Sequence, residues 1–216
     1  MKKFAVILAG NGVFDGAEIH EATLTLLSIM QNGGTYKIFA PDIAQHHVIN
    51  HLTGKEMPEK RNVLIESARI ARGKIFPLKD FLAINFDALI LPGGFGVAKN
   101  LCNFAFKGVE CQVNAEVEKA ILDMHRQKKP IGALCISPVV VSKVLGDVEL
   151  TIGSDPGTIG GIEKMGSKHI KTTHGQVVHD NSHNVFTTPC YMLDANILQI
   201  YDGTTNIVKA MMQSMQ

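Results

Sequence analysis

The sequence predicts an α/β protein in which a mostly parallel sheet is buried between two layers of helices. Short apolar runs alternate along the chain with longer segments whose apolar residues recur at helical spacing. The runs are apolar at successive positions rather than at every second one, so both faces of each strand have to be covered. Helices on both sides of a parallel sheet supply that cover, which gives a doubly wound arrangement.

Five apolar runs have the length and composition of strands. They are FAVILAG (Phe4–Gly10), TYKIFAP (Thr35–Pro41), FDALILPGG (Phe86–Gly94), PIGAL (Pro130–Leu134) and NVFTTP (Asn184–Pro189). Four segments show the periodicity of amphipathic helices. They are Glu18–Asn32, Asn62–Arg72, Asn114–Gln127 and Asp194–Met212. The segment His46–Pro58 has no clear period, and we expect it to leave the core.

Length and composition indicate one globular domain spanning residues 1–216. Hydrophobic residues make up 45% of the 216 residues and charged residues 19%, which supports a folded core and argues against disorder. The net charge of +1 offers no basic surface for nucleic acid or an anionic membrane, and no apolar run is long enough to span a bilayer. The N-terminal MKKFAVILAG is ended too soon by glycine for a secretory signal, so we expect a first strand and a cytoplasmic protein.

The cysteines and histidines show no metal-binding or disulfide pattern. No two of Cys102, Cys111, Cys135 and Cys190 have the C-x-x-C spacing, so free thiols are expected. None of the nine histidines falls in an H-E-x-x-H motif. The sequence therefore predicts neither a metal nor a cofactor.

Three predicted strands end in glycine-marked turns, and doubly wound folds gather their chemistry at such ends. At the first, Gly12 and Gly16 nearly match a dinucleotide fingerprint, with Asp42 in the place of the ribose-binding acid. The glycine spacing is one residue too long, and Asp15 and Glu18 would repel a pyrophosphate. A flexible strand-to-helix loop is the better interpretation, and we expect no NAD.

The second strand end carries Gly93 and Gly94 directly after the apolar run. Glycine lets the backbone turn with its N–H groups exposed, and exposed amides at a strand end can hold an oxyanion. An ordinary tight turn is the alternative interpretation.

The third strand end places Cys135 between a strand and a helix start. Ser137 is positioned to cap that helix, and Pro138 suits its first turn. A thiol at such a corner has the setting of a nucleophile elbow, and helix-end amides would lower its pKa. The alternative is a buried cysteine that acts as a small hydrophobic side chain. The other three cysteines lack this setting and are interpreted as structural.

A nucleophilic thiol needs a proton partner, and Cys135 is followed by Ile136 rather than by a histidine. Glu18 and Glu21 are three residues apart and share one helix face. A buried carboxyl group near a thiolate has a raised pKa and can carry a proton to and from a substrate. Glu18 is explained equally well by the helix dipole, whereas Glu21 lies on a mostly apolar helix. His20 could assist, although a surface or packing role is the simpler interpretation.

Longer strings around these positions resemble a known family. LILPGGFG followed by GALCISP is similar to the ThiJ/PfpI branch of the class I glutamine amidotransferase-like superfamily. Five more strings resemble the ElbB-like family, named for enhancing lycopene biosynthesis. They are GVFDGAEIHEATLTLL, VINHLTGKEM, RNVLIESARIARGKI, PGGFGVAKNLCNFA and TTPCYML. The resemblance covers nearly the whole chain.

The resemblance implies a flavodoxin-like three-layer sandwich with its cysteine on a strained elbow. Carried onto this chain, it makes Cys135 the nucleophile and Glu21 the acid that contacts the sulfur. It gives the oxyanion amides to Gly93 and Gly94, helped by Ile136. It also implies a homodimer.

The chain departs from the glutaminases and proteases of this superfamily because no histidine adjoins Cys135. We therefore expect neither activity. Cysteine–glutamate members of the branch are similar to cofactor-free, glutathione-independent glyoxalases of the glyoxalase III type, which convert small dicarbonyls to hydroxy acids. This lyase activity on a small aldehyde or dicarbonyl is the predicted function. The alternatives are a redox-sensing or regulatory protein linked to isoprenoid metabolism, and a lyase or hydrolase acting on another metabolite.

Overall fold

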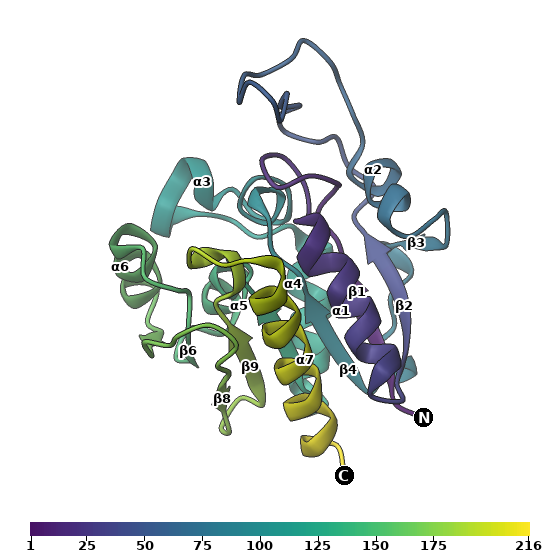
Figure 1. Ribbon diagram of the computed structural model, residues 1–216, viewed down its shortest axis with the longest axis vertical. Coiled ribbons are helices and arrows are strands. Elements are labelled where there is room, and N and C mark those ends of the chain that lie inside the picture. Colours follow the sequence, from purple (N-terminus) through teal and green to yellow (C-terminus); the bar gives the residue numbers. More distant parts are fainter.

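A computed structural model describes residues 1–216 and shows a seven-stranded sheet with helices on both faces (Figure 1). The strand order is β3-β2-β1-β4-β5-β9-β8, and all neighbours are parallel except β8, which is antiparallel to β9. The strands of this sheet are β1 (Lys3–Ile7), β2 (Thr35–Ala40), β3 (Ile75–Pro77), β4 (Ala88–Leu91), β5 (Ile131–Leu134), β8 (Val178–Asp180) and β9 (Val185–Thr188). A separate parallel pair is formed by β6 (Glu149–Leu150) and β7 (Lys168–His169).

Seven α-helices accompany the sheet. They are α1 (Ile19–Gln31), α2 (Val63–Ile70), α3 (Phe104–Lys107), α4 (Ala115–Arg126), α5 (Pro138–Leu145), α6 (Pro156–Lys164) and α7 (Ile197–Ser214). Helices α1 and α7 run side by side across the face turned to the viewer in Figure 1. Helices α4 and α5 pack on each other and on β5 from the other side. The predicted α/β sandwich is confirmed.

The middle of the sheet is the core of the molecule. Every residue of β4, β5 and β9 is buried, and so are the last four residues of β1. Parallel strands with both faces buried need cover on both sides, which the helices supply here, and this is the pattern from which the fold was predicted. One continuous cluster of 47 buried apolar residues joins these strands to the helices.

Side-chain caps fix where several helices begin. The Asn62 side chain accepts the amide hydrogen of Ile65 at the start of α2, with the two atoms 3.0 Å apart. Asn114 caps α4 in the same way, and Asn196 forms a reciprocal capping box with Gln199 at the start of α7. These polar residues explain why each helix begins within one to three residues of the predicted position, which is the usual uncertainty of a helix end.

The segment His46–Pro58 lies outside the sheet, as predicted. Its backbone forms an isolated antiparallel bridge between Ile49 and Glu56, and a second bridge joins Ala44 to Asn62 at its base. In Figure 1 this segment projects at the top of the molecule, beyond β1 and α2.

The parallel strands bring four chain segments to one edge of the sheet. The segments that follow β1, β4, β5 and β9 meet there because the carboxyl ends of parallel strands share an edge. Cys135 follows β5, and the Gly93-Gly94 turn follows β4. None of the helices combines the length and the apolar character that crossing a bilayer requires.

Candidate active site

Cys135 occupies a strained turn between β5 and α5. Its φ is +58°, in the left-handed region that costs a residue other than glycine of order 1–3 kcal/mol. Its amide donates to the Thr188 carbonyl at 3.0 Å, so the turn is held to the end of β9. The residue is buried, with an exposed fraction of only 6%. The predicted elbow is therefore present in the geometry.

Ser137 does not cap α5 as predicted. Its own backbone is already helical, and its side chain makes no bond to the first turn. Its hydroxyl instead donates to the Pro92 carbonyl at 2.7 Å, inside the core. This hydrogen bond joins the turn after β5, which contains Cys135, to the end of the neighbouring strand β4.

Glu21 lies on the first turn of α1, completely buried beside the cysteine. Its Oε2 accepts the amide hydrogen of Gly93 at 2.9 Å, and its Oε1 accepts that of Tyr191 at 3.2 Å. The carboxyl group is also hydrogen-bonded to the Cys135 thiol. Two backbone amides from distant parts of the chain thus fix the carboxyl group against the sulfur.

The pKa of Glu21 is raised to about 7, chiefly by burial and also by the charge of the nearby Glu18 carboxylate. The bonds from Tyr191, Cys135 and Gly93 oppose this rise without cancelling it. Burial and the charge of Glu21 likewise raise the pKa of the Cys135 thiol. The predicted lowering by amides is present but is outweighed. Two acids in contact inside the protein titrate as a pair, and this pair loses its first proton near neutral pH.

The Gly94 and Ile136 amides donate to the Cys135 sulfur, whereas the Gly93 amide does not. Gly93 is occupied by Glu21, so it is not a free oxyanion donor as expected from the sequence. Both glycines are required by close packing. A Cβ on Gly93 would lie 2.4 Å from the Cys135 Cβ, and one on Gly94, whose φ is +101°, would lie 2.4 Å from the Glu18 amide nitrogen.

A cavity of about 310 Å³ opens above the sulfur. Its apolar wall includes Val13, Phe95 and Met192, and its polar groups include Tyr191 and Thr158. A cavity of this size is at the lower end for small-molecule sites. None of these five residues was predicted as a site residue, and α6 and the turn after β9, which carry Thr158, Tyr191 and Met192, contain no catalytic motif. Only the string TTPCYML, which contains Tyr191, pointed to that turn.

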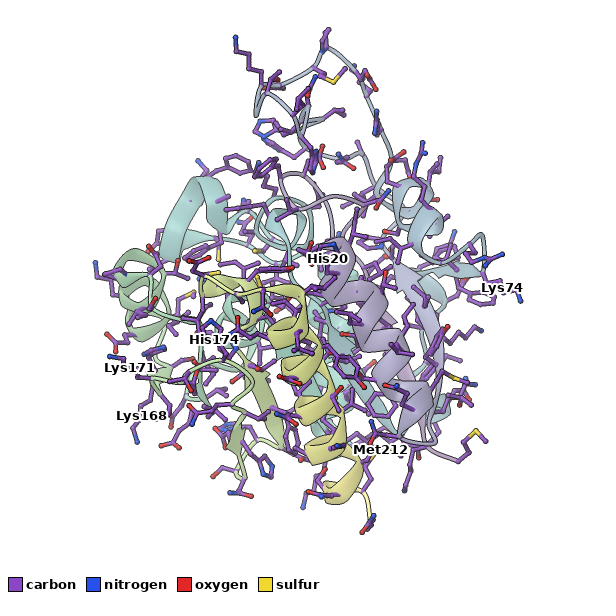
Figure 2. The ribbon with its side chains drawn as sticks, in the orientation of Figure 1. His20, Lys74, Lys168, Lys171, His174 and Met212 are labelled. Carbon is purple, nitrogen blue, oxygen red and sulfur yellow. The ribbon has the colours of Figure 1, made fainter.

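Glu18 and His20 lie near Glu21 and Cys135, and their hydrogen bonds go to groups other than the sulfur. Glu18 is the N-cap of α1, where its Oε2 accepts the Glu21 amide hydrogen at 2.7 Å. His20 is exposed, and its Nδ1 is 2.8 Å from the Tyr191 hydroxyl. Figure 2 shows His20 at the upper end of α1. Nowhere in the chain do three or more histidine, cysteine or acidic side chains converge in a way that could hold a metal ion.

Curated relatives match the chain over nearly its whole length. The ES1 protein homolog, mitochondrial, of Rattus norvegicus is 43% identical, and the match covers 98% of this chain and 83% of that protein. The glutamine amidotransferase-like class 1 domain-containing protein 3, mitochondrial, of Homo sapiens is also 43% identical, with 98% and 82% covered. The ES1 protein, mitochondrial, of Danio rerio is 34% identical, with 97% and 84% covered. No family model matches the sequence.

Solved structures share the fold. The isoprenoid biosynthesis protein with an amidotransferase-like domain from Ehrlichia chaffeensis superposes with a TM-score of 0.92 at 36% identity, covering 98% of this chain and 99% of that one. DJ-1beta of Drosophila melanogaster superposes with a TM-score of 0.57 at 18% identity, covering 99% and 91%. The second likeness concerns the fold alone.

These relatives correct the predicted cytoplasmic location. All three curated relatives are mitochondrial proteins by name. The prediction was wrong because it depended on MKKFAVILAG being a strand rather than a secretory signal. That stretch does contain β1, but a strand buried in a sheet carries no information about the organelle. With 43% identity over almost all of its length, the chain belongs to the ES1 and ElbB-like family of glutamine amidotransferase-like class 1 domain proteins, which have the ThiJ/PfpI-type fold.

Proposed function

We propose that the protein is a cofactor-independent glyoxalase-type lyase, which converts small dicarbonyls of the glyoxal class to hydroxy acids. The main support is the contact between Glu21, a buried acid whose pKa is about 7, and the thiol of Cys135 on its strained elbow. A general acid–base group is most effective when its pKa lies near the working pH. The cavity above the sulfur has room for a substrate of a few carbon atoms.

The first step is addition of the thiol to one aldehyde carbon. An S–C bond forms, the C=O π bond breaks, and the thiol proton passes to the Glu21 carboxylate. The developing oxyanion accepts hydrogen bonds from the Gly94 and Ile136 amides, which face the sulfur before the substrate binds. Glu21 then returns the proton to this oxygen, which gives a neutral thiohemiacetal.

The second step moves a proton between the two carbons. Glu21, again a carboxylate, removes the hydrogen from the sulfur-bearing carbon, and the electron pair forms the C=C bond of an enediolate while the neighbouring carbonyl oxygen takes the negative charge. The hydroxyl proton of the sulfur-bearing carbon passes to that oxygen. Glu21 then delivers the proton to the second carbon. The product is the thioester of a hydroxy acid on Cys135, with no net oxidation of the substrate.

The third step is hydrolysis. Water adds to the thioester carbon, the S–C bond breaks, and the sulfur recovers a proton through Glu21. Glyoxal and one water thus become glycolate and one proton. A single carboxyl group serves every proton transfer, which is consistent with the absence of a histidine contact to the sulfur.

The test supplies glyoxal to the purified protein and measures glycolate by NMR. The proposal expects many product molecules per protein chain and none from Cys135→Ala, while the matched control Cys102→Ala keeps the wild-type rate. A redox sensor, the alternative from a different class, would be modified once by glyoxal and release no product. That outcome would overturn the proposed activity.

We also propose that the protein is a homodimer. The apolar side chains Ile19, Leu27 and Met30 lie on one face of α1 and are 43–55% exposed. Ile197 and Leu198 at the start of α7 are exposed as well, and α7 packs against α1. Sedimentation of the wild type and of Leu27→Glu would test this assignment, with a shift to monomer expected for the variant.

A further inference from the structure

Cys102 and Cys111 form a second sulfur-containing site, separate from the Cys135 site. Cys102 follows the π-helical turn Val97–Leu101, and Cys111 follows the short turn Gly108–Glu110. Helix α3 lies between them and projects at the side of the molecule in Figure 1. No sequence pattern pairs these residues, because eight residues without a redox spacing separate them.

Backbone hydrogen bonds hold the two cysteines together. Cys102 forms an isolated antiparallel bridge with Val113, two residues beyond Cys111. Beside this bridge, the Asn103 amide donates to the Gln112 carbonyl at 3.2 Å, and the Gln112 amide donates to Asn103 Oδ1 at 2.7 Å. The Cys102 thiol donates to the Val97 carbonyl oxygen at 3.4 Å, and the two thiols are close enough for each to shift the pKa of the other. Their proximity is therefore part of the fold.

The two thiols have opposite electrostatic environments. The interaction with the Cys102 thiol and, after it, the charge of Lys143 lower the pKa of Cys111 to about 7, against the opposing effect of burial. The ammonium group of Lys143 is held in place by a bond to the Val109 carbonyl at 2.8 Å. The same interaction between the thiols, together with burial, raises the pKa of Cys102. Cys111 is thus the thiolate of the pair and Cys102 the thiol.

Cys111 also has a route to small reagents. It lines a surface cavity of about 360 Å³, together with Lys143 and Gln112. The Cys111 side chain forms part of the floor, since its exposed fraction is only 2%. Hydrogen peroxide is small enough for this cavity, and a thiolate beside a cation is the form of cysteine that peroxides oxidise.

We propose that Cys102 and Cys111 are a peroxide-oxidisable dithiol that closes to an intramolecular disulfide. The Cys111 thiolate attacks one peroxide oxygen; an S–O bond forms, the O–O bond breaks, and the departing hydroxide takes up a proton to become water. Cys111 is then a sulfenic acid. The Cys102 sulfur attacks the Cys111 sulfur, so the S–S bond forms and the S–O bond breaks. The second hydroxide takes the Cys102 proton and leaves as water.

The two steps, sulfenic acid formation and disulfide closure, need no reagent other than hydrogen peroxide. Two thiols and one hydrogen peroxide give one disulfide and two waters. The sulfurs have to approach to about 2.05 Å, which requires the two side chains to rotate and the Cys102 thiol to leave the Val97 carbonyl. No step uses Cys135 or Glu21, so the proposal is independent of the glyoxalase activity.

Peptide mapping tests the proposal on the wild-type chain. Trypsin cleaves after Lys107, so Cys102 and Cys111 fall in the separate peptides Asn100–Lys107 and Gly108–Lys119. The folded protein is treated with stoichiometric hydrogen peroxide, unreacted thiols are alkylated in denaturant, and the digest is analysed without reductant. The expected result is one cross-linked species two hydrogens lighter than the two peptides together, which disappears on reduction.

Three variants make the outcome specific. Cys135→Ser should keep the cross-link, because the active-site thiol takes no part. Cys102→Ser should lose it and leave Cys111 as sulfenic or sulfinic acid, whereas Cys111→Ser should lose it and leave Cys102 reduced. Phenylarsine oxide, which binds two adjacent thiols at once, should add once to the folded Cys135→Ser protein and not to either single variant of the pair. If both cysteines of the wild type stay fully alkylatable after peroxide, or if the cross-link joins Cys135 instead, the proposal is wrong.

Discussion

The Glu21 carboxyl group contacts the Cys135 thiol in a site where Glu21 is completely buried and Cys135 is exposed only to the cavity above it. Two backbone amides, from Gly93 and Tyr191, bind the two carboxyl oxygens, and two others, from Gly94 and Ile136, face the sulfur. A negative charge on either group makes ionisation of the other harder. Once the pair has lost its first proton, it therefore keeps the second over a wide pH range. The behaviour of the site depends on where that proton resides and on what keeps the two groups in contact.

Glu21 makes the stability of the fold depend on pH. Its pKa is raised in the folded protein from 4.5 to about 7, so the folded state binds more protons than the unfolded state between these values. The stabilisation by protonated Glu21 is complete below about pH 4.5 and is lost as the pH rises through about 7. At about 1.36 kcal/mol per pKa unit, the loss is roughly 3 kcal/mol. Glu21→Gln has no such titration.

Denaturant unfolding of both proteins across this range measures the effect. The difference in unfolding free energy, wild type minus Glu21→Gln, should fall as the pH rises. The substituted amide side chain has one carbonyl oxygen for two amide donors, so a constant offset is expected as well. A difference that does not change with pH would show that Glu21 keeps an ordinary pKa in the folded protein.

Glu18→Gln should shift the pH dependence of turnover without abolishing it. The glutamine carbonyl oxygen can still accept the Glu21 amide hydrogen and cap α1, but the negative charge beside Glu21 is gone. Because that charge raises the pKa of Glu21, the acid limb of the kcat/KM profile should move to lower pH. If Glu18→Gln acted only by weakening the N-cap of α1, it would cost about 0.5–2 kcal/mol of stability and leave the acid limb of the kcat/KM profile unchanged. The profile and an unfolding curve separate the two effects.

Gly93→Ala should damage the site far more than Gly160→Ala, a substitution at a glycine with open space around it. The added Cβ would lie 2.7 Å from Glu21 Oε2 and 2.4 Å from the Cys135 Cβ, so the two groups must move apart. Overpacking of this kind costs about 1–3 kcal/mol, and turnover should be lost as well. Gly160→Ala is the matched control, because a Cβ there meets open space inside α6 and should stabilise the helix by about 0.5–1 kcal/mol.

Thermal unfolding and glycolate assays of these two variants give the comparison. Equal activity in Gly93→Ala and Gly160→Ala would mean that the contact between Glu21 and Cys135 has no role in turnover.

The central strands and four helices could be predicted because their signals are local. Strands β1, β4 and β5 are apolar at successive positions, and asparagine caps mark the starts of α2, α4 and α7. The short elements had no such signal. Strand β8 has three residues and pairs only with β9, and α6 contains three glycines, which have low helix propensity. The proline and the Asp155 cap at the start of α6 were its only local signals.

The sequence predicted that Cys135 and Glu21 lie together, but it did not predict their individual contacts. Cys135 and Glu21 were found through the elbow setting and the family resemblance. Which amide faces which atom depends on backbone torsions that the spacing of Gly93 and Gly94 does not encode. Ser137 illustrates the same limit, because a cap residue and a core hydrogen-bond donor look alike in sequence. The Tyr191 amide reaches Glu21 across 170 residues of chain, a distance that no local pattern spans.

Alkylation of Cys135 should report the proton shared with Glu21. A small fraction of the mono-anionic pair carries its charge on sulfur, so the iodoacetamide rate in the wild type should rise with a midpoint near 7, the pKa of the coupled acid. In Glu21→Ala the thiol is a lone buried acid. Burial, the largest cause of its raised pKa, remains, so the midpoint should move to a higher pH. Turnover of glyoxal should fall by about 10²–10⁴-fold, because general acid–base help is lost.

Mass mapping separates this thiol from Cys111, which has no contact with Glu21 and whose labelling midpoint near 7 should be the same in both proteins. If the Cys135 midpoint is also unchanged, Glu21 and Cys135 do not share a proton, and the acid–base partner of the cysteine has to be sought among the other groups around the cavity.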